Sequence, residues 1–557
     1  MRPLSPRAAA LVATLHARAA LRERWLGRTD DRLAALAALR DEATPALVPE
    51  LLPLVFGERG AVRDAAVALV ARALAAATPD ALLWLDPACR GAGWWPPDAQ
   101  TGGWRGLTPT DVVQLDVPRA DAVPVLGVVG FHPFGHVREA AVAQLDRVAD
   151  PASAVAADGR ELPFLLIRRN DWVDAVAARA AATLERRVTP GLATAWLAWL
   201  PLLRRLGAHT RRDAGALADR VLAMLRAPAQ HPTLLARLTA GDRDTRRTCA
   251  RLLAEADPTP ATAAAFVSAA LRDPDPVVRR EAVTGARRHL AVDALTAMLP
   301  TALADPYPPM RRDALVAAAE RLGERATPWL MAGLLDSGRS VREVAQAEVA
   351  RRGVLTDVAG HYRGALAAAT TPAHLAVAAA GVGETGRAAD APALLPLLAH
   401  ERPAVRRAAA RALGRLDAAG NGATLLRLLH DPSRAVTRAV RDALRMHAVR
   451  PDADALAHVL HGDAPTHGQL DALGLADALS KWDRLAVLLD ALGSGEARVR
   501  DDARGRIAAW LARPNASFAQ PAAAQLTALR GLLGRRASAL PPTVASELGA
   551  VLDYWVR

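Results

Sequence analysis

Arginine offers the most chemistry in this sequence. Lysine and arginine together number 70 of 557 residues, and because Lys481 is the only lysine, 69 are arginine. Between Glu401 and Arg450, eleven arginines stand against four acidic residues, which gives this stretch +7 of the formal net charge of +12. Guanidinium groups bind carboxylates and phosphates through paired hydrogen bonds. The candidate partner contacts here are Arg407, Arg411, Arg415, Arg438, Arg441 and Arg445.

Three explanations fit this arginine surplus. Stacked basic helices would bind an acidic peptide, or they would follow the phosphate backbone of a nucleic acid. Arginine also solvates alanine-rich helix faces, and the near-total replacement of lysine by arginine resembles a high-GC coding bias. We favour a protein partner and keep nucleic acid as the alternative.

Tryptophan is concentrated between residues 81 and 130. Trp94, Trp95 and Trp104 fall in the segment GAGWWPPDAQTGGWRG, where glycine and proline are dense enough to break helices. We therefore expect an inserted loop over residues 91–109. Its tryptophans are either exposed anchors for a partner or a small satellite core folded onto the flank of the molecule.

A carboxylate stands beside an aromatic residue at Asp171 and Trp172, within FLLIRRNDWVDAV. The position opens a helix. We expect Asp171 to cap that helix and Trp172 to pack locally, with contact to a partner as the other possibility for Trp172.

Catalytic and metal-binding signatures are missing from the sequence. Lys481 lacks the glycine before it that a phosphate-binding loop requires, and neither HExxH, CxxC nor Gly-x-Ser-x-Gly occurs. Gly381–Gly386 spells GxGxxG but follows an alanine-rich helical stretch, so it is better interpreted as the turn that ends a repeat. His458, His461 and His467 with Asp463 suit a solvated loop better than a metal site. We predict no catalytic residue, metal, cofactor or small-molecule substrate.

The N-terminal segment has some features of a leader peptide. Arg2 and Arg7 precede the apolar run 8–15, and Ala17–Ala19 would serve as a cleavage site. The helical apolar period continues past Arg18 to Leu26, however, so we interpret this segment as a helix and expect a cytoplasmic protein. No uncharged apolar run of membrane-spanning length occurs, which predicts no membrane span. The two cysteines, Cys89 and Cys249, cannot form a disulfide framework.

An internal repeat must position these residues. DPDPVVRREAVT at Asp273 recurs as DPYPPMRRDALV at Asp305, and again in more divergent forms at Asp336, His400, Asp431 and Gly493. The apolar anchors of these blocks are separated by 32, 31, 64, 31 and 63 residues, so a unit of 31 or 32 residues recurs in phase. Such a period is typical of a solenoid. The anchors are Val278, Met310, Val341, Val405, Val436 and Val499.

Each unit reads as a pair of helices. Within 391–417, leucines form a short first helix, Pro403 suits the first turn of a second helix, and apolar residues from Val405 to Leu416 recur at helical spacing. Neither helix can bury its apolar stripe alone, so neighbouring pairs must stack.

The DPDPxVRxxA blocks, with ALGRLD at Ala412–Asp417, resemble HEAT repeats, in particular the short bacterial HEAT-like repeats of phycobilisome lyases. The resemblance implies an all-α fold: an α-solenoid, or superhelix, of stacked HEAT-like helical hairpins, here with one Trp/Gly/Pro-rich inserted loop. It implies that the second helices line a concave face. It also implies that turn aspartates and helix arginines pair between repeats as a structural ladder. The ladder residues are Asp273, Arg279, Asp305, Arg311, Asp336, Arg342, Arg406, Asp431 and Arg500.

The function that this resemblance favours is a non-catalytic adaptor that binds a protein partner along the concave surface. A nucleic-acid-binding solenoid that uses the arginines of 401–450 is the first alternative. The second is a DNA glycosylase acting through Asp171, or a lyase subunit, since both belong to the family.

The expected organisation has five parts. N-terminal repeats occupy 1–80, the irregular Trp-rich insertion 81–130, divergent repeats 131–257 and regular repeats 258–511. A helical cap follows over 512–557, where Leu548, Val551, Leu552 and Trp555 mark a final amphipathic helix.

Overall fold

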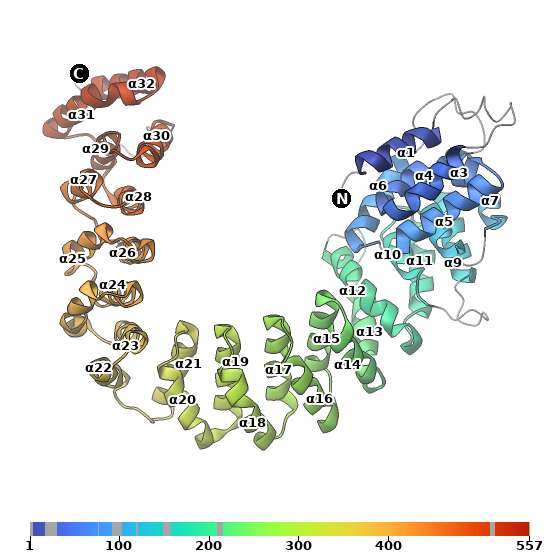
Figure 1. The fold of residues 1–557 in the computed structure, drawn as a ribbon, viewed down its shortest axis with the longest axis horizontal. Coiled ribbons are helices and arrows are strands. Elements are labelled where there is room, and N and C mark those ends of the chain that lie inside the picture. Colours follow the sequence, from blue (N-terminus) through green and yellow to red (C-terminus); the bar gives the residue numbers. More distant parts are fainter. Residues whose placement is uncertain are drawn as a thin grey trace. The chain divides into compact units, whose positions relative to one another are not determined.

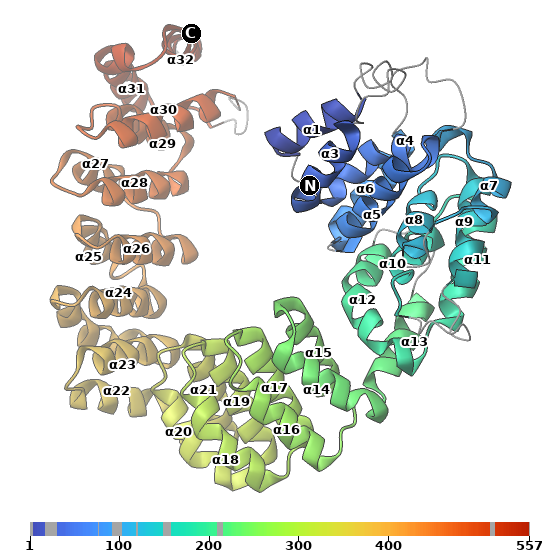
Figure 2. The same cartoon turned by 45° about the vertical axis from the view of Figure 1, so that its right-hand side comes forward.

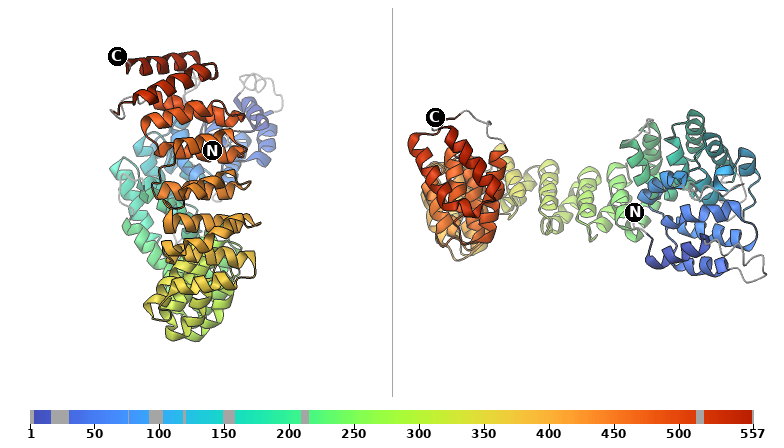
Figure 3. Two further views of the ribbon diagram at one scale, coloured as in Figure 1. Left: turned by 90° about the vertical axis from the view of Figure 1, so that its left-hand side faces the viewer. Right: turned by 90° about the horizontal axis from the view of Figure 1, so that it is seen from above.

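The structure, a computed structural model, is described over residues 4–16, 31–75, 77–91, 103–117, 121–148, 158–208, 215–512 and 519–555. Its described residues form helices joined by turns, and no strand is assigned among them (Figure 1). The chain divides into two compact units, Met1–Leu295 and Thr296–Arg557. Within each unit, helical hairpins stack side by side, as Figures 2 and 3 show from further directions.

Unit 1 begins with shorter and less regular helices and becomes regular toward its end. Its α-helices are α1 (Pro6–His16), α3 (Asp31–Ala38), α4 (Val48–Gly57), α5 (Ala61–Ala75), α6 (Pro79–Gly91), α7 (Pro109–Val113), α8 (Ala122–Val129), α9 (Gly135–Val148), α10 (Leu162–Arg169), α11 (Asp174–Arg186), α12 (Ala193–Ala208), α13 (Gly215–Arg226), α14 (His231–Ala240), α15 (Arg243–Glu255), α16 (Pro260–Ala270) and α17 (Pro276–His289). Five 3-10 turns join them: η1 (Leu39–Glu42), η2 (Pro45–Leu47), η3 (Trp104–Gly106), η4 (Pro190–Leu192) and η5 (Pro228–Gln230).

Unit 2 continues the hairpins to the C-terminal helices, and α18 (Val292–Leu303) spans the boundary between the units. Its other α-helices are α19 (Pro308–Arg321), α20 (Thr327–Leu334), α21 (Arg339–Arg351), α22 (Val358–Ala368), α23 (Pro372–Thr385), α24 (Pro403–Asp417), α25 (Gly422–Arg427), α26 (Arg434–Met446), α27 (Ala453–His461), α28 (Thr466–Leu475), α29 (Lys481–Ala491), α30 (Ala497–Leu511), α31 (Ala523–Arg536) and α32 (Pro542–Tyr554). The 3-10 segments are η6 (Gly323–Ala326), η7 (Ala388–Ala399), η8 (Leu428–His430), η9 (Ala476–Ala478) and η10 (Ala537–Ala539).

The Asp-Pro turn sets where a second helix begins. In α17, the Asp275 carboxylate accepts a hydrogen bond from the Val277 N–H at 2.8 Å, and Pro276 occupies a first-turn position that needs no N–H partner. The stripe that starts at Val278 and includes Ala282, Val283 and Ala286 is buried. The hairpin forms because the capped helix places this stripe against its neighbours.

The second helices form a row of their own within unit 2. Helix α24 contacts α26, α26 contacts α28 and α28 contacts α30. In Figure 1, α26, α28 and α30 lie on one side of the stack, while the first helices α25, α27 and α29 lie on the other. In this layering, exposed residues remain along one side of α24 and of α26.

The first helix expected near Leu394 is a twelve-residue 3-10 segment, η7, rather than an α-helix. Pro392 and Pro396 lie inside it, and because proline has no N–H, the regular i to i−4 hydrogen bonds cannot form at these positions. Leu394 is nevertheless buried, so the segment still fills the place of a first helix in the stack.

One irregular region differs from expectation, and the C-terminal end agrees with it. The interval 81–130 contains more helix than predicted, because α6 runs to Gly91 and α7 and α8 follow, so the described part of the expected 91–109 loop is η3 and its flanks. Trp94 and Trp95 lie outside the described residues. At the C-terminal end, α32 is the expected amphipathic helix, and its Leu548 and Leu552 are fully buried.

Candidate partner-binding face

The ladder arginines hold the turns of the repeats in register. Arg311 of α19 donates from Nε and Nη2 to the two carboxylate oxygens of Asp336 at 2.8 and 2.7 Å, and Arg406 of α24 does the same to Asp431 at 2.6 and 2.8 Å. The remaining nitrogen, Nη1, donates to carbonyls at the base of the arginine's own helix, as Arg406 does to His400 O at 2.8 Å. Each guanidinium therefore joins two successive turns.

The carboxylate of each ladder pair also shapes its own turn. Asp336 Oδ1 accepts from the Gly338 N–H and Asp431 Oδ1 from the Ser433 N–H, at 2.6 and 2.8 Å. Asp305 Oδ1 accepts from Tyr307 in the same way. Arg279 Nη1 donates to Asp273 O and Pro274 O, the carbonyls at the base of its own helix. Arg279 lies in unit 1, and Asp305, the aspartate of the following turn, lies in unit 2.

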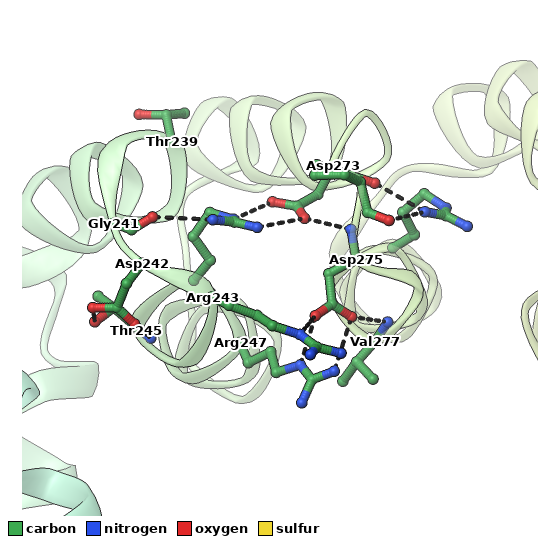
Figure 4. A network of polar contacts seen from close by, with 12 residues as sticks. Thr239, Gly241, Asp242, Arg243, Thr245, Arg247, Asp273, Asp275 and Val277 are labelled. Carbon is green, nitrogen blue, oxygen red and sulfur yellow. Dashed lines mark hydrogen bonds and ion pairs between the residues drawn. The ribbon is translucent and has the colours of Figure 1, made fainter.

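A doubled version of this contact joins α15 to the turn before α17 (Figure 4). Arg246 pairs with Asp273, while Arg243 and Arg247 both donate to Asp275, from Nε at 2.7 and 2.8 Å. Burial alone would raise the pKa of Asp275, but the hydrogen bonds from Arg247, Arg243 and the Val277 N–H lower it well below the ordinary aspartate range. The helix cap stays ionised and anchored.

Where the repeat motif is missing from the sequence, the ladder arginine pairs with a glutamate instead of a turn aspartate. Arg342 meets no aspartate in the next turn and instead pairs with the buried Glu384 of α23, at 2.6 and 3.0 Å. Glu384 also accepts from Gln346 Nε2 at 2.9 Å and lies 3.5 Å from Arg415 Nη1. Sequence reasoning missed this carboxylate; the 64-residue gap between Val341 and Val405, which marks a unit without the motif, was the available signal.

Glycines of the GxGxxG stretch serve close helix packing. A Cβ at Gly381 would collide with the Tyr362 ring, and one at Gly383 would collide with Ala412 of α24. Helix α23 runs to Thr385, so Gly381–Thr385 form the end of a helix and not the expected turn; the stretch follows no strand.

Asp171 is a buried structural carboxylate and not a helix cap or a catalytic group. Arg138 of α9 binds it through Nε and Nη2, both at 2.8 Å, and Arg168 Nη1 adds a third contact at 2.8 Å. Helix α11 begins only at Asp174, with Val173 as its N-cap. Burial would raise the pKa of Asp171, but its hydrogen bonds from Arg138 and Val173 and the charges of Arg168 and Arg138 lower it. The glycosylase interpretation of Asp171 is therefore wrong, because the carboxylate is fully enclosed and committed to arginines.

The tryptophans named as candidate contacts differ in exposure. Trp104 is buried against Phe56 and His132, and its Nε1 donates to Cys89 O at 2.9 Å, so it cannot serve as a surface contact. Trp172 is 52% exposed, with the Arg90 and Arg138 guanidinium carbons 4.0 and 4.5 Å from its ring centroid. Both cysteines are buried, and burial raises the pKa of the Cys249 thiol to about 12.

The histidines near residue 460 do not converge. His461 pairs with Asp490 at 2.7 Å, Asp463 pairs with His430 at 2.9 Å, and His467 lies 3.2 Å from Asp431 O. Across the described residues, no group of three potential ligands is arranged to hold a metal ion.

The six candidate arginines of 401–450 separate into two sets. Arg441 is committed to Asp471 of α28 at 2.7 Å and to Asp442, and Arg415 is half-buried near Glu384. Arg407, Arg411, Arg438 and Arg445 are exposed. We call these four residues the arginine patch.

The patch lies on the uncovered sides of two neighbouring second helices. Helix α24 is covered by α23, by η7 and by α26, while α26 is covered by α24, by the α25–η8 segment and by α28. Along α24 the exposed residues Ala404, Arg407 and Arg411 follow helical spacing. The same applies to Ala435, Arg438 and Arg445 on α26. The arrangement can bind an extended anionic surface.

Residues 231–319 and 364–445 match the protein family described as HEAT repeats. These matching stretches extend from α14 to α19 and from within α22 into α26. Curated proteins give no match. Solved structures similar to this chain include the Kap95:Nup1 complex, at 12% identity and a TM-score of 0.35, covering 98% of this chain and 80% of that one. Importin beta in an ammonium sulfate condition is similar at 13% identity and a TM-score of 0.30, with 98% and 78% covered.

The predicted fold class is confirmed: the described chain is an all-α solenoid of stacked HEAT-like hairpins within each unit. No described helix has the length and apolarity needed to cross a membrane.

Proposed function

We propose that this HEAT-repeat chain is a non-catalytic scaffold that binds a protein partner along the second helices of unit 2. The observation that carries the proposal is the uncovered side of α24 and α26, where exposed residues follow one another along both helices. Solenoids use surfaces of this kind for recognition because successive repeats add area without closing a pocket. The finer resemblance, to the short repeats of phycobilisome lyases, and a cytoplasmic location both remain predictions.

Two features favour a protein over a chemical substrate. Two buried carboxylates of unit 2, Glu384 and Asp471, are already neutralised by arginines of neighbouring helices. The uncovered face itself offers small side chains at Ala404 and Ala435 between charged ones. Small residues let a partner's backbone approach, and the surrounding polar groups then form the rim of an interface.

The test is affinity purification of the tagged full-length chain from its native host, with and without nuclease treatment. We expect a defined protein to remain bound after nuclease. Trp at Ala404 and Ala435 adds bulk to the second-helix side, so the double variant A404W/A435W should lose that protein.

The matched control adds the same bulk to first helices. Ala423 of α25 and Ala528 of α31 are also exposed, and the double variant A423W/A528W should retain the partner. If nuclease releases everything bound, or if the two double variants behave alike, binding along the second helices of unit 2 is refuted.

A further inference from the structure

The arginine patch lacks the counter-charges that other arginines of unit 2 have. Among the described residues, Arg407, Arg411 and Arg445 form no ion pair, and Arg438 forms only a long one, with its Nε 3.8 Å from Asp442 Oδ2. By contrast, Arg406 and Arg441, on the same two helices, are each held by a carboxylate at 2.7 Å or less. The fold therefore uses one set of arginines for register, whereas the arginine patch has no carboxylate closer than 3.8 Å among the described ion pairs.

The like charges of the arginine patch also reduce the stability of the folded chain. Arg407 and Arg411 are four residues apart on α24, where like charges destabilise a helix. Burial lowers the pKa of the Arg411 guanidinium, and the charges of Arg407 and Arg438 lower it further, with Asp442 opposing them. A partly desolvated cation surrounded by cations is stabilised when an anion arrives.

The limited extent of the arginine patch and the apolar residue beside it suit a protein segment. On the α28 side, Arg441 is neutralised by Asp471, so the positive surface stops at α26. Met446, 72% exposed, follows Arg445 directly and offers an apolar contact beside the charge. A nucleic-acid strand would call for aromatic stacking platforms and a longer cationic track, and neither α24 nor α26 contains an aromatic residue.

We propose that the arginine patch binds carboxylates of an acidic segment in the protein partner. This inference rests on the proposed scaffold function and adds to it the chemistry of the partner. The guanidinium groups of α24 and α26 would each donate a pair of hydrogen bonds to a glutamate or aspartate carboxylate, and Met446 would contact an apolar residue next to them.

The test compares two sets of charge reversals. Arg407→Glu, Arg411→Glu and Arg438→Glu form the patch variant. Arg427→Glu, Arg498→Glu and Arg535→Glu form the control, since these arginines are exposed elsewhere in unit 2. Each set removes six charge units, two per substitution, and takes the formal net charge from +12 to +6. Circular dichroism checks that both variants retain the helical fold.

The probes are a fluorescein-labelled peptide in which glutamate alternates with alanine and leucine, and single- and double-stranded DNA of matched charge. At physiological salt we expect the full-length chain to bind the peptide more tightly than either DNA. The patch variant should bind the peptide about tenfold more weakly or worse, and the control within about twofold of wild type. Tighter binding to DNA, equal losses in both variants, or no peptide binding would overturn the inference.

The inference and the scaffold function can fail separately. If the patch variant still retains the native partner while A404W/A435W loses it, the partner binds this face without needing the arginines, and only the inference fails. If the wild-type chain retains no protein at all, the scaffold function fails as well.

Discussion

A ladder arginine uses the two edges of its guanidinium for different tasks. In Arg406, Nε and Nη2 bind the Asp431 carboxylate of the following turn, and Nη1 binds carbonyls of its own turn. Lysine has one nitrogen and cannot make this set of contacts. The side chain therefore fixes the spacing between repeats more than it adds charge, which separates it from the exposed arginines next to it.

Removing Arg406 should destabilise unit 2. Arg406→Ala leaves the buried Asp431 without its partner, and breaking a buried ion pair typically costs about 3 kcal/mol or more. Urea denaturation measures the loss. The control is Arg402→Ala in the same turn, because Arg402 and Glu401 are both mostly exposed and such pairs contribute at most about 1 kcal/mol. Equal effects of the two substitutions would show that the ladder contact does not stabilise the fold.

His132 occupies the turn position that aspartate holds in other repeats. Its Nδ1 accepts from the Phe134 N–H at 3.1 Å, and its Nε2 lies 2.8 Å from Trp104 O, to which it donates in this tautomer. Burial, with the charges of Arg138 and His136, lowers the pKa of His132 to about 4. The folded ring is therefore neutral at pH values where an unfolded histidine is already protonated.

This pKa predicts acid sensitivity of unit 1. Below the unfolded pKa of about 6.5 the unfolded chain takes up a proton that folded His132 does not, so stability falls as the pH drops toward 4, by up to about 3 kcal/mol. His132→Asn keeps an acceptor for the Phe134 N–H and cannot titrate. Urea midpoints measured between pH 7 and pH 4 should decline less in this variant than in wild type. An identical decline would assign the acid sensitivity to other groups.

At the scale of helices, close approach explains which positions tolerate a side chain. Gly383 lies where α23 crosses Ala412 of α24, and a methyl group there would collide with the neighbouring backbone. Gly364 of α22 lies at an exposed helical position with open space around it. Both are glycines inside helices, but only the first is required by packing.

Alanine substitution should therefore act in opposite directions at these two glycines. Gly383→Ala should cost about 1–3 kcal/mol through overpacking. Gly364→Ala should add up to about 1 kcal/mol, because alanine loses less backbone entropy in a helix. Thermal unfolding of the two variants provides the comparison. A stabilising Gly383→Ala would mean that α23 and α24 are packed less closely than described.

Helix-level features followed from local patterns, while tertiary contacts did not. The Asp-Pro turns and the apolar stripe after Val405 predicted the second helices, because caps and periodicity are local properties. The commitment of Arg441 to Asp471, the contact of Arg138 with Asp171, and the burial of Trp104 depend on residues far apart in sequence. Those contacts required the fold, so the arginine patch could be separated from the structural arginines only in three dimensions.

At the scale of the molecule, each unit is stabilised by contacts between neighbouring repeats. In unit 2, the second helices from α24 to α30 pack directly against one another. Between α21 and the following hairpin, the contacts include polar ones: Arg342 and Gln346 bind Glu384, and Gln346 also binds Tyr362. Because a solenoid's stability is a sum over neighbours, this polar seam is where unit 2 should open most readily. The uncovered face of α24 and α26 lies beyond the seam, on the regular part of the stack.

Site-specific photo-crosslinking in the native host tests the central claim most directly. A photoreactive residue at Ala404 or Ala435 should crosslink to one protein partner, and the same residue at Ala423 or Ala528 on the first helices should not. The claim that a partner binds along the second helices of unit 2 would be contradicted by crosslinks confined to Ala423 and Ala528, or by the absence of crosslinks at all four positions.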